Sequence, residues 1–356
     1  MIKGIVCLVL GGIMSIKKFV ALLLAGALCL SAFTGCSANP EDTVATLGEE
    51  TVDFGVANFL VKYQKANVED MYKMYGMTWS SDVYGNGTTL EDDFKDSAMQ
   101  LLHDLYTLKN HMADYGVEIT AEDETAIKEA ASAFLAANSE AAIEELGATQ
   151  EIVEEVLALY TIQAKMYQAI IVGADTNVSA EEANMRGYCL VTINTDGEYD
   201  ENYKFVEYTD AEVAVLKETA KEMEKQLASK TLEEAADALG YEVTTSAYAK
   251  DDTTIDETLL SAMDELKEGE VSKAVETENT IYFARIDKDT DEEATESNRQ
   301  SIIAEREATY FEEIVTAWQE NDGWKVEEAV VEKIDFHNVF TQVEESTEDT
   351  DNTESE

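Results

Sequence analysis

The chain has 356 residues, of which 45% are hydrophobic, and 75 Asp and Glu residues stand against 25 Lys and Arg residues. Its formal net charge of −50 argues against a nucleic-acid partner, because proteins that bind nucleic acid need a basic surface to displace counterions from phosphates. Apolar residues recur along the chain up to its acidic end, so composition also excludes general disorder.

Residues 1–35 have the features of an export signal. Lys17 and Lys18 precede an uncharged run over 19–33, and a Thr-Gly-Cys sequence ending at Cys36 follows. A basic region, a short apolar run and small residues before the cleavage point are typical of secretory signals, whereas a membrane span takes about 20 apolar residues. The chain is therefore expected to be exported.

The end of this segment resembles the lipobox of bacterial lipoproteins, although Phe33 stands where that motif usually has leucine. The resemblance implies cleavage before Cys36, a lipid on the Cys36 sulfur, and location at the extracytoplasmic face of the cell membrane. An ordinary secretory signal is the alternative. The sequence leaves open whether translation begins at Met1 or at Met14.

The next part of the chain is predicted to be helical after one short hairpin. Residues 44–52 alternate around Gly48, a pattern that indicates a pair of strands. Apolar residues then recur at three- and four-residue spacing, which predicts helices over 54–75, 90–115, 121–135 and 149–172. Residues 36–182 are therefore expected to form a helical domain.

Helix and strand patterns then alternate, which predicts a small α+β domain over 183–289. Its helix starts are marked by a Ser or Thr followed three residues later by a Glu, at Ser179, Thr209 and Thr231. Its strand-like runs are 188–193, 241–248 and 280–286.

The rest of the chain is expected to complete the helical domain and to end in a disordered tail. Residues 297–320 read as a long helix and residues 325–334 as a last strand, so 290–342 forms a C-terminal segment. Residues 343–356 contain many acids and no apolar residue after Val343, which predicts a disordered tail.

Residues 266–277, Leu-Lys-Glu-Gly-Glu-Val-Ser-Lys-Ala-Val-Glu-Thr, resemble the LKxGExSxPVxT signature of parvulin-type (PpiC-type) peptidyl-prolyl isomerases. The Tyr-Cys-Leu-Val sequence from Tyr188 stands where that family has HILV, and residues 280–286 stand where it has GYHIIKV. Tyr188 and Tyr282 therefore occupy the positions of two family histidines. The resemblance makes these two tyrosines the candidate catalytic residues.

The same resemblance implies a substrate-binding set. Counted back from the signature serine, Ser272, the family's pocket methionine falls on Ile255 and a pocket phenylalanine on Leu259. Cys189, beside Tyr188, is the third residue assigned to substrate binding, and the alternative is that it is a small buried hydrophobic residue. The glycine-rich loop of the family has no counterpart here.

Taken together, the predicted elements are similar to SurA/PrsA-type foldases. That resemblance implies an α+β fold in which a mostly helical chaperone domain carries an inserted parvulin-like domain with a small sheet. It implies a membrane-anchored foldase whose partners are unfolded or partly folded exported polypeptides. It also leaves a homodimer open as the assembly.

Two other functions stay open at this point. One is a chaperone with a degenerate, non-catalytic isomerase domain, and the other is a lipoprotein that binds a solute or acts as a scaffold. No phosphate loop or dinucleotide fingerprint is present, so no cofactor is expected. His103 and His111 lie eight residues apart without a third ligand at a suitable spacing, and no metal site is predicted.

Overall fold

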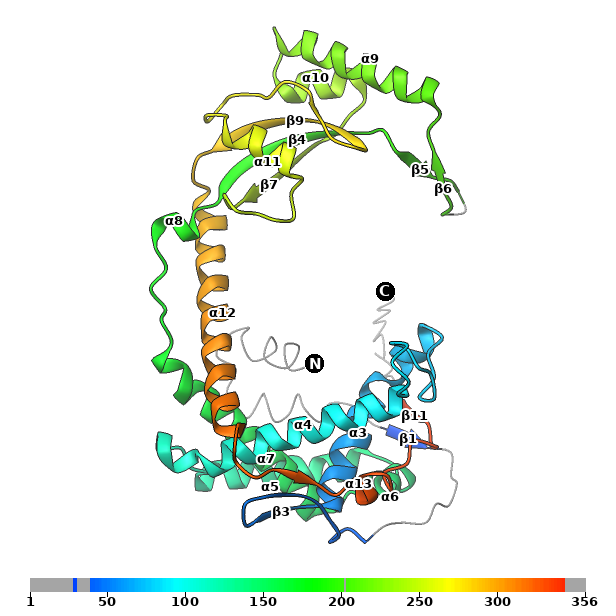
Figure 1. Ribbon diagram of the computed structural model, residues 1–356, viewed down its shortest axis with the longest axis vertical. Coiled ribbons are helices and arrows are strands. Elements are labelled where there is room, and N and C mark those ends of the chain that lie inside the picture. Colours follow the sequence, from blue (N-terminus) through cyan, green and yellow to red (C-terminus); the bar gives the residue numbers. More distant parts are fainter. Residues whose placement is uncertain (1–27, 31–38, 202, 343–356) are drawn as a thin grey trace, which may run out of the picture. The chain divides into compact units, whose positions relative to one another are not determined.

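The structure is a computed structural model that describes residues 28–30, 39–201 and 203–342. The chain divides into two compact units, one of residues 175–306 and one of the flanking parts up to 174 and from 307 (Figure 1). The domain boundaries expected at 183 and 289 lie within the first of these and stay predictions.

Several sequence-based expectations fall outside the described residues. They are the lipidation site Cys36, the acidic tail 343–356, and the export signal apart from residues 28–30. Those three residues form β1 (Leu28–Leu30), which pairs antiparallel with β11 (Phe340–Gln342).

The flanking unit, called the helical unit below, begins with the predicted hairpin. It consists of β2 (Thr43–Leu47) and β3 (Glu50–Asp53), and β10 (Lys325–Val326) adds a third strand on the other side of β2. Five helices follow the hairpin: α3 (Phe54–Met74), α4 (Leu90–Asn110), α5 (Ala121–Ala137), α6 (Glu140–Leu146) and α7 (Gln150–Ile170). The short α6 was not predicted from the sequence.

Local sequence explains where most of these helices start. The side chains of Thr89, Thr120, Ser139 and Thr149 each accept a hydrogen bond from a backbone N–H in the first turn of α4, α5, α6 and α7. Such caps satisfy amide groups that have no partner within the helix. By length and composition α7 could cross a membrane, but half of its most apolar window is buried inside the unit, as in a core helix.

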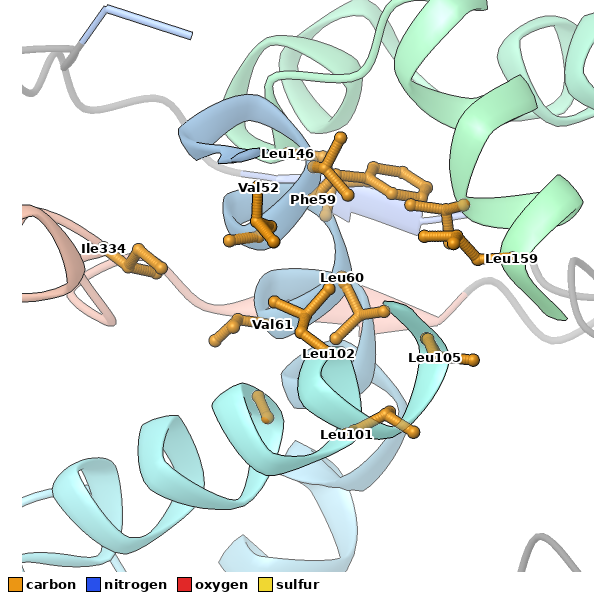
Figure 2. Close-up of a cluster of buried hydrophobic side chains, with 14 of the residues drawn as sticks. Val52, Phe59, Leu60, Val61, Leu101, Leu102, Leu105, Leu146, Leu159 and Ile334 are labelled. Atoms are coloured by element: carbon orange, nitrogen blue, oxygen red, sulfur yellow. The ribbon is translucent and has the colours of Figure 1, made fainter. Parts of the chain in front are cut away.

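The core of the helical unit lies where α3 meets α4 and α7 (Figure 2). Burying one side chain of the size of Leu or Phe contributes about 1.5–3 kcal/mol, so each large member of this cluster stabilises the unit. The labelled members are Val52, Phe59, Leu60, Val61, Leu101, Leu102, Leu105, Leu146, Leu159 and Ile334.

The C-terminal segment differs from its prediction in one place. The long helix is confirmed as α12 (Glu292–Gln319), and its residues Phe311 and Val315 pack on α7 side chains. The predicted strand 325–334 is wrong, because only β10 is extended and α13 (Glu328–Val331) follows it. Val330 of α13, Val326 of β10 and Ile334 just after the helix all pack in the core of the helical unit.

The second unit, residues 175–306, is built on a four-stranded antiparallel sheet in the order β7-β4-β9-β8 (Figure 1). The strands are β4 (Arg186–Asn194), β7 (Val243–Tyr248), β8 (Val275–Glu276) and β9 (Thr280–Lys288). A separate hairpin of β5 (Gly197–Tyr199) and β6 (Phe205–Glu207) follows β4. This hairpin was not predicted.

Helices cover both faces of this sheet. Side chains of α9 (Asp210–Leu227) and α10 (Leu232–Leu239) pack on one face, and those of α11 (Glu257–Asp264) pack on the other. The predicted capping boxes are present before α8 (Ala180–Ala183), α9 and α10. The expected α+β class, mostly helical with small antiparallel sheets, is confirmed.

Candidate functional site

The candidate site is the sheet face that α11 covers. Alternation along β4 and β9 places Tyr188, Leu190, Tyr282, Ala284 and Ile286 on this face, together with side chains of α11 and the end of β7. We call it the tyrosine face, after Tyr188, Tyr282 and Tyr248 of β7. Its side chains are apolar or aromatic. Leu259, Ala284 and Ile286 are buried, whereas Tyr188, Tyr282 and Ile255 are only half-buried and can contact a group that avoids water.

The strand register keeps Tyr188 and Tyr282 apart on this face. Tyr188 lies opposite Ile286, whereas Tyr282 lies opposite Thr192, four residues further along β4. Four residues of a strand span about 13 Å. The two family histidine positions are therefore occupied by tyrosines at two separate places on one surface.

Both of these tyrosines have hydroxyls that a ligand could use. Each side chain is half-buried, and within the described ranges neither hydroxyl has a hydrogen-bond partner. A phenol can donate one hydrogen bond and accept others. Either ring can therefore contact a peptide while its hydroxyl bonds to a peptide carbonyl.

Tyr248 is the buried support of Tyr188. The two rings pack edge to face with their centroids 5.6 Å apart. The Tyr248 hydroxyl accepts a hydrogen bond from Arg186 Nη1 at 2.9 Å and donates one to Asp264 Oδ1 at 3.2 Å. Burial raises the pKa of Tyr248 to about 12, so the hydroxyl stays protonated and keeps donating at neutral pH.

Arg186 connects this aromatic pair to α11. Its guanidinium also donates to the backbone oxygens of Met263 at 3.0 Å and Leu266 at 2.7 Å, at the end of the helix, and pairs with Asp289 at 2.8 Å. A planar guanidinium with five donors can hold several acceptors in fixed directions. Sequence reasoning missed both Arg186 and Tyr248, although each lies at an end of a predicted strand.

Hydrogen bonds to the backbone of β9 hold the signature segment beside that strand. The Ser272 N–H donates to Ala284 O at 2.7 Å, and Ser272 Oγ accepts from Ala284 N at 2.9 Å. Gly269 has φ +83°, a backbone conformation that disfavours other residues, and donates its N–H to Ile286 O. Gly269 and Ser272 therefore fix the edge of the sheet beside the tyrosine face.

The predicted substrate-binding residues do not all lie together. Leu259 is buried in α11 and Ile255 lies just before that helix, and both pack in the cluster that contains Tyr188 and Tyr282. Cys189 instead lies on the opposite sheet face, among side chains of α9 and α10. The structure thus brings four of the five predicted side chains together and separates Cys189 from them.

Cys189 is held by charged neighbours on its own face. Its thiol donates to Asp287 Oδ2 at 2.7 Å, and Arg285 Nη2 lies 3.4 Å from the sulfur. Burial and the adjacent Asp287 carboxylate raise the pKa of the thiol to about 11. The thiol is protonated at neutral pH, and this argues against a nucleophilic role.

The two histidines considered for a metal site lie in separate environments. His103 stacks on Trp324 and bonds to Asp322 at 2.6 Å, whereas His111 stacks on Trp318. Within residues 28–30, 39–201 and 203–342, no group of three or more His, Cys, Asp or Glu side chains could hold a metal ion.

Comparison with known families identifies the type of domain in the second unit. Residues 196–299 match the family described as "PPIC-type PPIASE domain". The resemblance to PpiC-type isomerases is thereby confirmed, and the chain contains a domain of this type between its helical parts. Ile255, Leu259 and Tyr282 lie within the matched range, and Tyr188 lies before it. No curated protein matches the chain.

Solved structures similar to the chain include foldases and chaperones. The PrsA foldase of Lactococcus lactis is 15% identical, with 82% of this chain and 97% of that one covered and a TM-score of 0.31. PrsA of Bacillus cereus is 13% identical, with 83% and 98% covered and a TM-score of 0.33. One of two SurA-like chaperones of Campylobacter jejuni is 9% identical, with 85% and 99% covered and a TM-score of 0.27.

Proposed function

We propose that the chain is an extracytoplasmic foldase that binds X-Pro segments of unfolded exported polypeptides on the tyrosine face and accelerates their isomerisation. The observation that carries the proposal is the PPIC-type match together with an apolar face that keeps Tyr282, Ile255 and Leu259 in one cluster. The PrsA and SurA-like proteins named above are described as foldases and chaperones, which agrees with this class.

The reaction requires no nucleophile. Rotation about an X-Pro bond crosses a barrier of about 18–20 kcal/mol and takes tens to hundreds of seconds without a catalyst. The twisted amide of the transition state has lost conjugation, so a water-excluding surface that grips the proline ring favours it over the planar amide. The half-buried side chains of Ile255 and Tyr282 would supply that surface, with the buried Leu259 packed behind them, and a tyrosine hydroxyl would hold a neighbouring carbonyl.

Location follows from the sequence features of the N-terminal segment. The export signal and the lipobox-like cysteine support attachment of Cys36 to the outer face of the cell membrane. An anchored protein would meet exported chains as they emerge. Its net charge of −50 would keep bound clients soluble and would favour clients with basic segments.

A refolding assay tests this function. An unfolded, proline-limited secreted protein is diluted into buffer with and without the chain, and both aggregation and the slow refolding phase are followed. We expect less aggregation and a faster slow phase. Tyr282→Ala should reduce both effects, whereas Tyr241→Ala should not, because Tyr241 is also half-buried but packs on the opposite sheet face. Equal behaviour of the two variants would contradict the proposed site.

A second function, holding clients without isomerising them, is favoured by one observation. Tyr188 and Tyr282 are four strand positions apart, so the pair cannot act on one amide in the way two adjacent groups could. Reduced aggregation with an unchanged slow phase in the same assay would identify this function.

A further inference from the structure

The hairpin formed by β5 and β6 exposes an unusual number of apolar side chains. Tyr199 is 70% exposed and Tyr203 is 89% exposed, and Phe205 and Val206 are exposed beside them. We call this segment, residues 197–207, the aromatic hairpin; residue 202 is not among the described ones. Exposed apolar side chains gathered on one short element are typical of a binding surface.

Backbone pairing gives the aromatic hairpin a fixed shape. Gly197 pairs with Glu207 and Tyr199 with Phe205, and the rings of this second pair contact edge to face at 5.4 Å. A Cβ atom at Gly197 would lie 2.2 Å from the Val206 carbonyl oxygen, so only glycine allows this close pairing.

Tyr203, at the tip of the hairpin, carries its most exposed ring and has an unfavourable backbone conformation. Among the described residues, Tyr203 alone combines a side chain with a positive φ, of 60°. The Asp200 carbonyl accepts the Tyr203 N–H, and the Asp200 carboxylate accepts the Lys204 N–H, both at 2.9 Å. The left-handed conformation is unfavourable for a residue with a large side chain, and such strain is concentrated at functional sites.

The aromatic hairpin begins beside the tyrosine face. Thr192, near the end of β4, lies opposite Tyr282, and Asn194 at the end of that strand donates from its side chain to Gly197 O at 2.7 Å. The hairpin therefore begins at the Tyr282 end of the face.

The charge of the hairpin indicates which peptides it would accept. Glu198, Asp200, Glu201 and Glu207 stand against the single basic residue Lys204, so the segment has a formal charge of 1 − 4 = −3. Aromatic rings also attract cations through their faces. Acidic surfaces are repelled by anionic membranes and by a second copy of this acidic chain.

We propose that the aromatic hairpin binds unfolded client segments in which Lys or Arg alternates with apolar residues, and so selects basic clients for the tyrosine face. The rings of Tyr199 and Tyr203 contact the apolar side chains, and the surrounding carboxylates pair with the basic ones. This inference rests on the proposed function and adds to it a class of client and a place of first contact.

The test measures binding without isomerisation. A fluorescent, proline-free peptide of alternating Lys and Leu is titrated with the full chain, and binding is followed by anisotropy at low and physiological salt. The hairpin variants are Tyr199→Thr and Tyr203→Asn, since Thr suits a strand and Asn tolerates the left-handed conformation. The control is Tyr84→Thr, because Tyr84 is 72% exposed in a loop of the helical unit. Circular dichroism confirms that all variants remain folded.

We expect each hairpin variant to weaken binding about fivefold to tenfold and the pair to weaken it further, with Tyr84→Thr unchanged. A peptide with Glu in place of Lys should bind at least tenfold more weakly, and added salt should reduce this difference. Hairpin variants that bind like the unmodified chain, equal binding of the Glu peptide, or preferential binding to vesicles of anionic lipid would overturn the inference.

The refolding assay distinguishes a failure of the foldase proposal from a failure of the hairpin inference. If the unmodified chain suppresses aggregation and both hairpin variants do so equally for a basic client, the foldase proposal stands and the hairpin inference is wrong. If the unmodified chain has no effect in that assay but binds the basic peptide through the hairpin, the foldase proposal fails while the binding site remains.

Discussion

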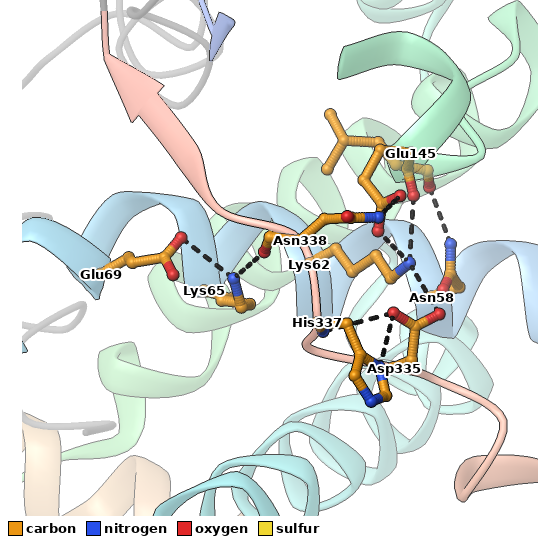
Figure 3. A network of polar contacts seen from close by, with 9 residues as sticks. Asn58, Lys62, Lys65, Glu69, Glu145, Asp335, His337 and Asn338 are labelled. Atoms are coloured by element: carbon orange, nitrogen blue, oxygen red, sulfur yellow. Dashed lines mark hydrogen bonds and ion pairs between the residues drawn. The ribbon is translucent and has the colours of Figure 1, made fainter. Parts of the chain in front are cut away.

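Lys65 provides the sharpest test of how the helical unit is held together. It lies on α3, its side chain is 1% exposed, and its Nζ bonds to Glu69 Oε2 at 3.0 Å and to Asn338 O at 2.7 Å (Figure 3). Glu69, 3% exposed, also accepts from Phe340 N at 3.0 Å and from Trp79 Nε1 at 3.3 Å. This network joins α3 to the C-terminal segment that leads into β11.

Lys65→Met keeps most of the side-chain volume but leaves the buried Glu69 carboxylate with Lys73 as its remaining countercharge, whose Nζ is 3.9 Å from Glu69 Oε1 on a side chain that is 43% exposed. Removing one partner of a buried ion pair costs about 3–5 kcal/mol, and the two remaining hydrogen-bond donors to Glu69 together with Lys73 place the expected loss near 3 kcal/mol. Lys65→Met with Glu69→Gln removes the poorly compensated charge, so the double variant should be about 1–2 kcal/mol more stable than Lys65→Met alone. Lys73→Met removes the more distant and exposed partner of Glu69 and should cost less than about 1 kcal/mol.

The assay is denaturant unfolding followed by tryptophan fluorescence. The three tryptophans, Trp79, Trp318 and Trp324, all belong to the helical unit, so their signal reports the unfolding of that unit alone. The reasoning would be refuted if Lys65→Met lost no more unfolding free energy than Lys73→Met. It would also be refuted if the double variant lost as much as the Lys65→Met and Glu69→Gln single variants lose when their effects are added.

Two further predictions concern the signature segment and alkaline pH. Gly269→Ala should destabilise the second unit by about 1–2 kcal/mol, because φ +83° is unfavourable for alanine. The β9 amides should then exchange hydrogen faster. Unchanged exchange would contradict the role given to this glycine. Burial raises the pKa values of Tyr160 and Tyr167 to about 12, above the usual value of 10. Their stabilising contribution is complete below pH 10 and is lost as the pH rises from 10 to 12, because the unfolded chain releases these protons first. The fluorescence-detected stability of the helical unit should therefore fall across that range, and a constant stability would contradict the burial of the two hydroxyls.

Local signals in the sequence explain the elements that could be predicted. A Ser or Thr three residues before an Asp or Glu marks the starts of α8, α9 and α10, and the alternation around Gly48 marks the first hairpin. These patterns involve residues within one turn of each other, so they can be recognised without knowing how the rest of the chain packs. Gly269 and Ser272 of the signature segment were identified through the resemblance to the parvulin signature, and both bond to the adjacent strand β9.

The missed features depend on contacts between distant parts of the chain. Lys65 and Glu69 are spaced like an ordinary surface pair on a helix, and only the packing of Asn338 and Phe340 on α3 buries them. The separation of Tyr188 from Tyr282 is likewise set by the register of β4 on β9, which motif spacing does not reveal. Cys189 was assigned to substrate binding together with residues of the tyrosine face, but it follows Tyr188 on a strand, and neighbouring residues of a strand point to opposite faces.

The most direct measurement of function is the cis-to-trans rate of a short X-Pro peptide in the presence of soluble protein spanning residues 37–342. We expect acceleration over the spontaneous rate, a clear decrease with Tyr282→Ala, a smaller one with Tyr282→Phe, and no change with Cys189→Ser, whose side chain lies on the other face. A rate equal to the spontaneous one, or acceleration that Cys189→Ser abolishes and Tyr282→Ala leaves intact, would contradict catalysis on the tyrosine face.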